Sequence, residues 1–444
     1  MKQNIDIMEK APVFQAILRL ALPSVLAMMV QVIYGLTDTF FIAQTNDPIL
    51  VAAISLVLPF AMILQAVGNI FAFGGGTYIS QMLGAKRPDY ARQICASSFY
   101  LSALTGGMIA IVCQPLISPI LHLLGSSAIT WDATQTYLSI MITCSFVQIL
   151  QIVLAGLIRS EGATKQAMYG ILLGTGLNII LDYLFILKFG WGIAGAAWAT
   201  ILGNLGGVFY YLFYFHFSGT LLGIRFGDFK PTPQMVKNII SIGLPVAVNT
   251  LIMSLSHILT NNVAMGYGET TMAASGIMGR LLAISIFLQM GIAQGYQPFA
   301  GYNYGAHLFL RLKQGFFAAL TLSSCVGVVM AIIFFGFGHF LVGLFIDNPE
   351  VIERAVTMIN AFAWALPLFA LNFLTGMTFQ SSGHPHLALG LVLSRQLGLF
   401  LPMLYILNYF FGFKGFIFAQ PLSDIPIAFV AIFLMRKFFK KQIS

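Results

Sequence analysis

The sequence predicts an all-α polytopic membrane protein, with about twelve transmembrane helices in two six-helix bundles related by an internal repeat. The 444 residues are 58% hydrophobic and only 8% charged, and the mean hydropathy is +0.88. Soluble domains have about 25% charged residues, which excludes that class. Apolar runs of about 20 residues, each long enough to cross a bilayer as a helix, recur along the chain. The two halves also share short motifs at a nearly constant spacing.

Charged, Gly-bearing or Pro-bearing breaks separate the apolar runs and define the expected spans. We place the spans at residues 15–44, 50–73, 90–114, 133–157, 165–187, 192–216, 237–265, 271–296, 310–336, 355–379, 386–409 and 413–436. The first run is too long for the core of a signal peptide, so we expect it to be a retained helix.

Each half carries the same landmarks in the same order. A Leu-Pro pair opens the first and the seventh span, and glycines follow near the ends of later spans. The matching pairs are Pro23 and Pro245, Gly84 and Gly305, Gly162 and Gly383, and Gly195 and Gly415. Because the spacing is close to half the chain, we expect two bundles in the same orientation with a substrate cavity between them.

The segment near 216–238 is rich in Gly, Pro and charge, which is typical of a linker. We therefore expect an N-terminal six-helix bundle at residues 1–216, a cytoplasmic linker at 217–236 and a C-terminal six-helix bundle at 237–444.

The net charge of +8 is a topology signal. Of the 22 Lys and Arg residues, only Lys188, Arg354 and Lys414 fall on the side opposite the termini, and Arg280 and Arg395 fall within spans. All others, Arg159 among them, lie on the side of the termini. By the positive-inside rule both termini are cytoplasmic. We accordingly expect no nucleic-acid partner.

The cysteines and histidines carry no site signature. The four cysteines are scattered through apolar spans without a CxxC or Cys/His cluster, which argues against a disulfide framework and against a zinc site. Neither HExxH nor a Cys/His or Ser/His constellation occurs. We therefore expect no metal and no enzyme.

The first span carries an acid, Asp38, deep inside apolar sequence. A carboxylate inside a membrane helix costs about 2.5 to 3.5 kcal/mol on insertion scales and marks a functional site by default. Gln31, Tyr34, Asp38 and Phe41 recur at three- and four-residue spacing and share one helix face. We expect this face to line a cavity.

The two halves of the repeat differ at the position of Asp38. Allowing a shift of one residue, Asp38 corresponds to Asn261 in the seventh span, so the second half keeps an amide where the first has an acid. Arg280 lies within the eighth span without an obvious partner. We expect Asn261 and Arg280 to line the cavity with Gln31 and Tyr34.

A second acid lies in the fifth span. Gly170, Gly174, Asn178 and Asp182 follow at four-residue spacing, so two glycines that permit close helix approach precede a polar pair. Asp182 lies at about the same depth in its span as Asp38, so the two carboxyl groups can meet in the first bundle. Such a pair is suited to take up and release a proton or a small cation.

The second half has its own charges at membrane depth. Arg395 and Asp424 both reach mid-depth in the eleventh and twelfth spans. We expect them to form a structural ion pair, because a buried charge needs a partner.

Taken together, these residues resemble the multidrug and toxic compound extrusion (MATE) family of cation-coupled exporters. The resemblance covers nearly the whole chain and rests on GLTDTFFIA around Asp38, QMLGAKRPDYAR, RSEGATKQAM, LNIILDYLFI and QGYQPFAGYNYGA in this order. It implies a cation site in the N-terminal half. Matching positions give Asp38, Asn178, Asp182, Tyr137 and Thr200.

The predicted function is that of a secondary antiporter. It would export amphipathic, often cationic organic compounds in exchange for protons or sodium ions, without another cofactor. The alternatives are a flippase for a lipid-linked precursor, which would need a larger and more cationic cavity, and a channel. Small organic molecules and the lipid bilayer are the expected partners. We expect a monomer in the plasma membrane, the inner membrane of a bacterium.

Overall fold

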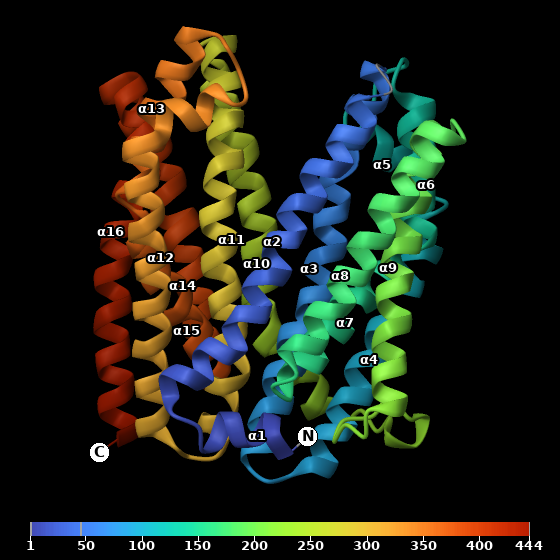
Figure 1. Cartoon of the computed structure of the whole chain (residues 1–444), viewed down its shortest axis with the longest axis vertical. Coiled ribbons are helices and arrows are strands. Elements are labelled where there is room, and N and C mark those ends of the chain that lie inside the picture. Colours follow the sequence, from blue (N-terminus) through green and yellow to red (C-terminus); the bar gives the residue numbers. More distant parts are fainter. Residues whose placement is uncertain (1, 45–46, 444) are drawn as a thin grey trace.

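The computed structural model describes the backbone of residues 2–44 and 47–443, and it confirms a helical fold of two bundles that stand side by side (Figure 1). Lobe 1 contains α1 (Lys2–Glu9), α2 (Val13–Ala43), α3 (Pro48–Gly84), α4 (Pro88–Cys113), α5 (Ile117–Leu123), α6 (Trp131–Thr143), α7 (Ser145–Ser160), α8 (Thr164–Asp182), the π-helix η1 (Tyr183–Lys188) and α9 (Gly192–Phe217). The short helix η2 (Phe226–Asp228) lies in the connection.

Lobe 2 follows the connection and repeats this plan. It contains α10 (Pro233–Met265), α11 (Glu269–Gly305), α12 (Phe309–Gly343), α13 (Pro349–Ala363), α14 (Leu366–Ser381), α15 (Pro385–Leu393), the π-helix η3 (Ser394–Phe400) and α16 (Leu401–Ile443). Both chain ends lie at the same end of the molecule (Figure 1), which we call the terminal end; the opposite one is the far end.

Several helices begin where a polar cap precedes a proline. Before α3, the Asp47 carboxylate accepts a hydrogen bond from the Ile49 N–H at 2.9 Å. Before α10, the Thr232 hydroxyl accepts one from the Met235 N–H at 3.2 Å. These caps satisfy backbone donors that the first helical turn leaves unpaired, and the following proline lacks such a donor. The cap at Thr232 explains why α10 begins at Pro233, inside the linker expected at 217–236.

The described helices account for the expected number of spans. Nine helical segments are long and apolar enough to cross a membrane, and two bent pairs raise the number to eleven. One of the nine, Pro385–Ile443, has 59 residues, whereas one crossing needs about 20. Its backbone leaves the helical conformation at Gly412, with φ 57° and ψ −137°. We therefore count two crossings there and twelve in all among the described residues.

The two bent pairs occupy corresponding places in the two lobes. The chain turns by 53° between α6 and α7 and by 50° between α13 and α14. The sequence predicted one uninterrupted span at each place, 133–157 and 355–379. Only Cys144 lies between the two helices of the first bend. Because neither Pro nor Gly occurs there, the local sequence does not predict the bend.

The lobes meet through helices that pass unusually close at the terminal end. α3 packs against α10 and α2 packs against α11. A Cβ added to Gly74 would overlap the Ile239 carbonyl oxygen, and one added to Gly243 would overlap that of Ile70. The Gly74–Gly75–Gly76 run therefore serves helix packing. Toward the far end the two bundles separate (Figure 1).

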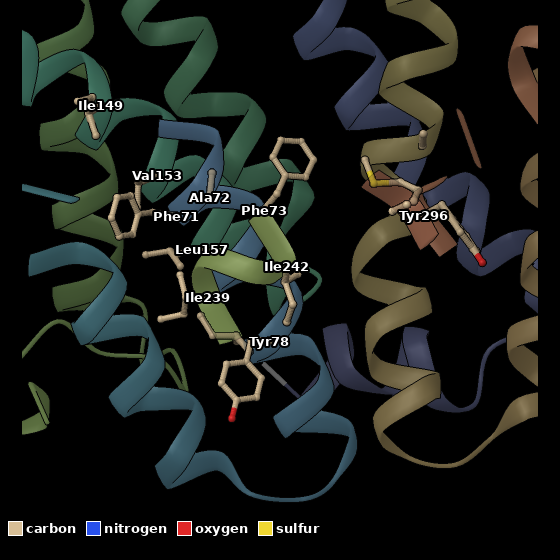
Figure 2. Packing of buried hydrophobic residues seen from close by; sticks show 14 of the residues in the cluster. Phe71, Ala72, Phe73, Tyr78, Ile149, Val153, Leu157, Ile239, Ile242 and Tyr296 are labelled. Carbon is tan, nitrogen blue, oxygen red and sulfur yellow. The ribbon is translucent and has the colours of Figure 1, made fainter. Parts of the chain in front are cut away.

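The apolar core continues across this contact. One cluster of buried side chains joins residues of α3 and α7 to residues of α10 and α11. Figure 2 shows Ile239 and Ile242 of α10 beside Leu157 of α7 and Tyr78 of α3. The terminal end is thus sealed by apolar packing that belongs to both lobes.

The connection between the lobes is fastened to lobe 1. The Arg92 Nε donates to the Leu221 carbonyl oxygen at 3.0 Å, and the Tyr100 hydroxyl donates to that of Ile224 at 2.9 Å. The rings of Phe226 and Phe229 pack on Tyr100 with centroids 5.6 and 5.1 Å away. The connection therefore follows lobe 1 as far as Phe229.

Candidate functional site

A cavity of about 410 Å³ lies between the lobes. Its wall combines apolar side chains with many side-chain amides. The amides are those of Gln31, Gln65, Asn69, Gln151, Asn249, Gln294, Gln297, Asn372 and Gln380. Methionine and phenylalanine provide much of the apolar surface, and both adapt to ligands of different shape. The lining methionines and phenylalanines are Met28, Met62, Phe73, Met253, Phe287, Met290, Phe373 and Met377.

Few titratable groups reach this wall. Among the described residues that line it, Arg159, His257 and Arg395 are the only ones with a charge or a titratable ring, and no aspartate or glutamate is present. The described wall therefore presents positive charge without an acid of its own.

Arg395 is neutralised within lobe 2. Its Nε lies 2.6 Å from Asp424 Oδ1, and a second nitrogen lies 3.3 Å from Oδ2. The guanidinium also lies over the Phe369 ring, 5.1 Å from its centroid. Arg395 belongs to the π-helical turn η3, and Asp424 is 1% exposed. The structure thus brings together the two residues that the sequence places at one depth.

Arg159 has a different environment. It is 9% exposed, and its NH1 donates to Gln294 Oε1 at 2.7 Å, which joins α7 of lobe 1 to α11 of lobe 2. The sequence places this residue just after the expected span 133–157, on the side of the termini. The structure extends that helix, because α7 continues to Ser160 and carries Arg159 into the cavity wall.

Of the described residues expected to line the cavity, only Gln31 belongs to its wall, whereas Tyr34, Phe41, Asn261 and Arg280 do not. Tyr34 lies instead with its hydroxyl 3.5 Å from Thr200 Oγ1 of α9, inside lobe 1. Asn261 and Arg280 are exposed. Both lie in the far-end halves of α10 and α11, where the lobes have separated (Figure 1).

Lobe 1 holds a second polar site, away from the cavity wall. Asn178 and Asp182 are 3% and 0% exposed. In the amide orientation that satisfies both neighbours, Asn178 donates to Asp182 Oδ2 at 3.1 Å and accepts from the Thr200 N–H at 3.2 Å. With the contact of Tyr34, this site joins α2, α8 and α9. Tyr137 is buried on α6, which packs against α9.

Asp38 falls on helix α2, but its side chain lies outside the part of the structure that is described. The position of the Asp182 site is nevertheless informative, because α8 gives way to the π-helix η1 directly after Asp182. Single π-helical turns in membrane and soluble proteins frequently mark functional sites.

The glycines before Asn178 bring α8 and α9 together. A Cβ added to Gly170 would overlap the ring of Tyr211, and one added to Gly174 would lie 3.0 Å from the Gly203 carbonyl oxygen. On α9, a Cβ at Gly203 would lie 2.7 Å from the Cβ of Asn178. The small residues confirm the predicted close approach and press Asn178 against α9.

The described residues contain no group of three or more His, Cys, Asp or Glu side chains arranged to hold a metal ion.

Comparisons with known proteins agree with this architecture. The MatE family model matches residues 23–184 and 245–406, so each lobe matches once, from the proline of its Leu-Pro pair. Multidrug export protein MepA of Staphylococcus aureus (strain MSSA476) is 32% identical over 430 residues, which cover 96% of this chain and 94% of that protein. MepA of Staphylococcus haemolyticus is 31% identical over the same length.

Solved structures share the fold. One described as "Outward-facing conformation of a multidrug resistance MATE family transporter of the MOP superfamily" has a TM-score of 0.94 and 24% identity, covering 99% of this chain and 98% of that one. A crystal structure of MATE in complex with MaL6 has a TM-score of 0.95 and 24% identity, covering 100% and 99%. The chain therefore belongs to the MatE family of multidrug and toxic compound extrusion transporters.

Proposed function

We propose that this chain is a secondary antiporter that exports amphipathic organic compounds in exchange for protons or sodium ions. The observation that carries the proposal is the cavity between two repeated lobes, lined by amides, methionines and phenylalanines. Such a wall suits ligands of varied shape. The relatives that cover almost the whole chain are named multidrug export proteins, which supports the same function.

The coupling ion would bind in lobe 1. Asp182 with Asn178 forms the centre of the proposed site, and Asp38, Tyr137 and Thr200 complete it. Carboxylate, amide and hydroxyl oxygens are suited to hold a small hard cation, and a buried carboxylate can hold a proton. Because α2 lies along both α8 of lobe 1 and α11 of lobe 2, a change at Asp182 can reach the lobe interface through α2.

The orientation follows from the basic residues. We propose that the terminal end faces the cytoplasm, since the Lys and Arg residues gather there. The close packing at Gly74 and Gly243 then closes the cytoplasmic side, and the end at which the two bundles separate faces the outside (Figure 1). The protein would work as a monomer in the plasma membrane of a bacterium.

A flippase for a lipid-linked precursor is less well supported. A pyrophosphate group calls for several cations, whereas the described cavity wall has two arginines. One of these, Arg395, is already neutralised by Asp424. A channel is also less well supported, because the terminal end is sealed by an apolar core.

Transport into proteoliposomes tests the proposal. Proton and sodium gradients are imposed separately, and uptake of an amphipathic dye is followed in each case. We expect one of the two gradients to drive accumulation against a dye gradient. Dye movement that ignores both gradients would exclude antiport and leave a channel or a uniporter.

A further inference from the structure

We infer that Arg159 forms an anion subsite in the cavity wall, and that the preferred substrates are amphipathic compounds that carry a carboxylate. The inference rests on the proposed export function and names its substrate class. It starts from a guanidinium that is 91% removed from solvent and lines the cavity. Within the described part of the chain, it has one hydrogen-bond partner, Gln294.

Most N–H donors of the Arg159 guanidinium have no hydrogen-bond acceptor among the described residues. A guanidinium has five N–H donors in a fixed fork, and the Gln294 amide oxygen accepts from one nitrogen. Among the described residues, no carboxylate forms an ion pair with Arg159. A buried cation without a counter-ion is costly, and a ligand carboxylate that accepts two of the free donors would offset that cost.

Arg395, the second arginine of the wall, differs from Arg159 because its charge is compensated by a carboxylate. Arg395 holds both oxygens of Asp424 and lies over the Phe369 ring. It offers little to a ligand. The described wall therefore carries one uncompensated positive charge, at Arg159, and no acid that would attract a purely cationic compound.

The internal repeat shows that the fold does not need this charge. Arg159 of RSEGATKQA corresponds to Gln380 of QSSGHPHLA in the second half. Gln380 also lines the cavity and donates to the Ile242 carbonyl oxygen at 2.8 Å. A neutral amide thus suffices at the equivalent position of lobe 2, and Arg159→Gln copies what the chain itself tolerates there.

The neighbours of Arg159 fit the rest of such a ligand. Gln151 and Gln294 supply amide groups to the same cavity wall, while Phe73 and Ile152 supply apolar surface. The Gln297 amide is already used, because it donates to the Thr77 hydroxyl and to the Phe73 carbonyl oxygen. A compound with a carboxylate at one end and an aromatic or aliphatic body would satisfy both. A basic amine on the same body is tolerated, because the wall is otherwise neutral.

A matched pair of dyes tests the subsite. Binding of a carboxyrhodamine with a free carboxylate is compared with binding of its methyl ester by fluorescence polarisation on the purified full-length protein. We expect the acid to bind the wild type about ten- to hundredfold more tightly, as the loss of charge-assisted hydrogen bonds predicts. Equal affinities, or no binding of either dye, would overturn the inference without any variant.

Three variants then assign the difference to Arg159. Arg159→Gln should weaken binding of the acid by about tenfold or more and leave the ester unchanged, while Arg159→Lys should keep part of the preference. Arg436→Gln removes an equal charge at an exposed position of α16 and should change neither dye. A preference for the acid that survives in Arg159→Gln would place the anion elsewhere and refute the subsite.

Two further measurements distinguish a substrate carboxylate from a lipid phosphate at the subsite, and the subsite from the proposed antiport function. Phosphatidylglycerol that competes with the acid in the wild type but not in Arg159→Gln would support the subsite and identify a lipid phosphate as a second occupant. The dyes are also used in the gradient-driven uptake assay. An acid preference that depends on Arg159, together with uptake that ignores both gradients, would sustain the subsite and refute antiport.

Discussion

Gly84 and Gly305, which hold equivalent positions in the two halves, each press against a backbone carbonyl group of the opposite lobe. A Cβ at Gly84 would overlap the Tyr302 carbonyl oxygen, and one at Gly305 would overlap that of Gln81. The Gln81 side chain also crosses the interface and donates to the Ser381 carbonyl oxygen at 3.0 Å. The sealed terminal end thus rests on a symmetric contact that only glycine fits.

The first prediction follows from this contact. Gly84→Ala and Gly305→Ala should each destabilise the arrangement that is closed at the terminal end, by about 1 to 3 kcal/mol, because a methyl group is forced into packed backbone. Distances between spin labels on the terminal ends of the two lobes should lengthen in a larger fraction of molecules. Gly107→Ala is the control, since nothing lies within 4 Å of its added Cβ. Unchanged distance distributions in both variants would contradict the role of the contact.

A second prediction concerns the proposed coupling site. Asp182→Asn should abolish gradient-driven export while the protein is still produced and folded, because an amide of the same shape cannot take up a proton and lacks the negative charge that attracts a cation. Uptake in proteoliposomes measures this. Asp132→Asn alters an exposed acid and should keep full activity. Export at the wild-type rate in Asp182→Asn would remove Asp182 from the coupling mechanism.

A third prediction concerns reciprocity between ion and substrate. If the coupling ion and the exported compound favour different conformations, each must weaken the binding of the other by the same factor. The affinity for the dye, measured in nanodiscs, should therefore fall as the concentration of the coupling ion rises. In Asp182→Asn the affinity should depend less on that concentration. The measurement is repeated with pH and with sodium varied separately. A dependence that persists unchanged in the variant would point to a different ion site.

A fourth prediction concerns the ion pair of Arg395 and Asp424. Asp424→Asn leaves a cation buried without its counter-ion and should cost about 3 to 5 kcal/mol, while adding Arg395→Gln should restore part of this loss. The melting temperature in detergent ranks the variants by stability. The exposed pair of Lys10 and Asp6, with side chains 71% and 51% exposed, provides a control cycle with a coupling below about 1 kcal/mol. A double variant as unstable as Asp424→Asn alone would refute the pairing as a source of stability.

A fifth prediction uses Glu161, in the turn between α7 and α8. Burial raises the pKa of its carboxyl group, although the Tyr214 and Thr220 hydroxyls donate to it at 2.7 and 2.6 Å. The folded protein therefore binds this proton more tightly than the unfolded chain does. The resulting stability is present below the ordinary glutamate pKa and is lost as the pH rises through the raised pKa.

Thermal unfolding measured from about pH 4 to about pH 8, a range that starts near the ordinary glutamate pKa, should show this loss in the wild type and less of it in Glu161→Gln. Glu269→Gln changes an exposed acid and should follow the wild type. Identical pH profiles in the wild type and Glu161→Gln would contradict the prediction.

The sequence predicted those parts of the site that depend on membrane depth and helix periodicity. Arg395 and Asp424 could be matched because charges at one depth in adjacent spans must find each other in an apolar medium. The stripe from Gly170 to Asp182 could be placed because helix spacing puts its members on one face. Both inferences need only the sequence positions of the residues.

Arg159 was missed for a physical reason. Near the end of a span, an arginine can extend to water or turn into the protein, and hydropathy does not distinguish the two. The internal repeat could have indicated its role. In the alignment of the two halves, the charged Arg159 corresponds to the neutral Gln380, just as Asp38 corresponds to Asn261. The bend at Cys144 had no such signal, because it depends on how α6 and α7 pack against their neighbours.

The attachment of the connection to lobe 1 sets a mechanical limit on the transport cycle. Since the chain is bonded or packed to lobe 1 up to Phe229 and α10 begins at Pro233, the tether between the lobes is only Lys230–Thr232. Three residues reach about 10 Å at most. In the proposed alternating access, the lobes can therefore part at the terminal end only as far as this tether allows, and a wider opening there would require the connection to detach from lobe 1.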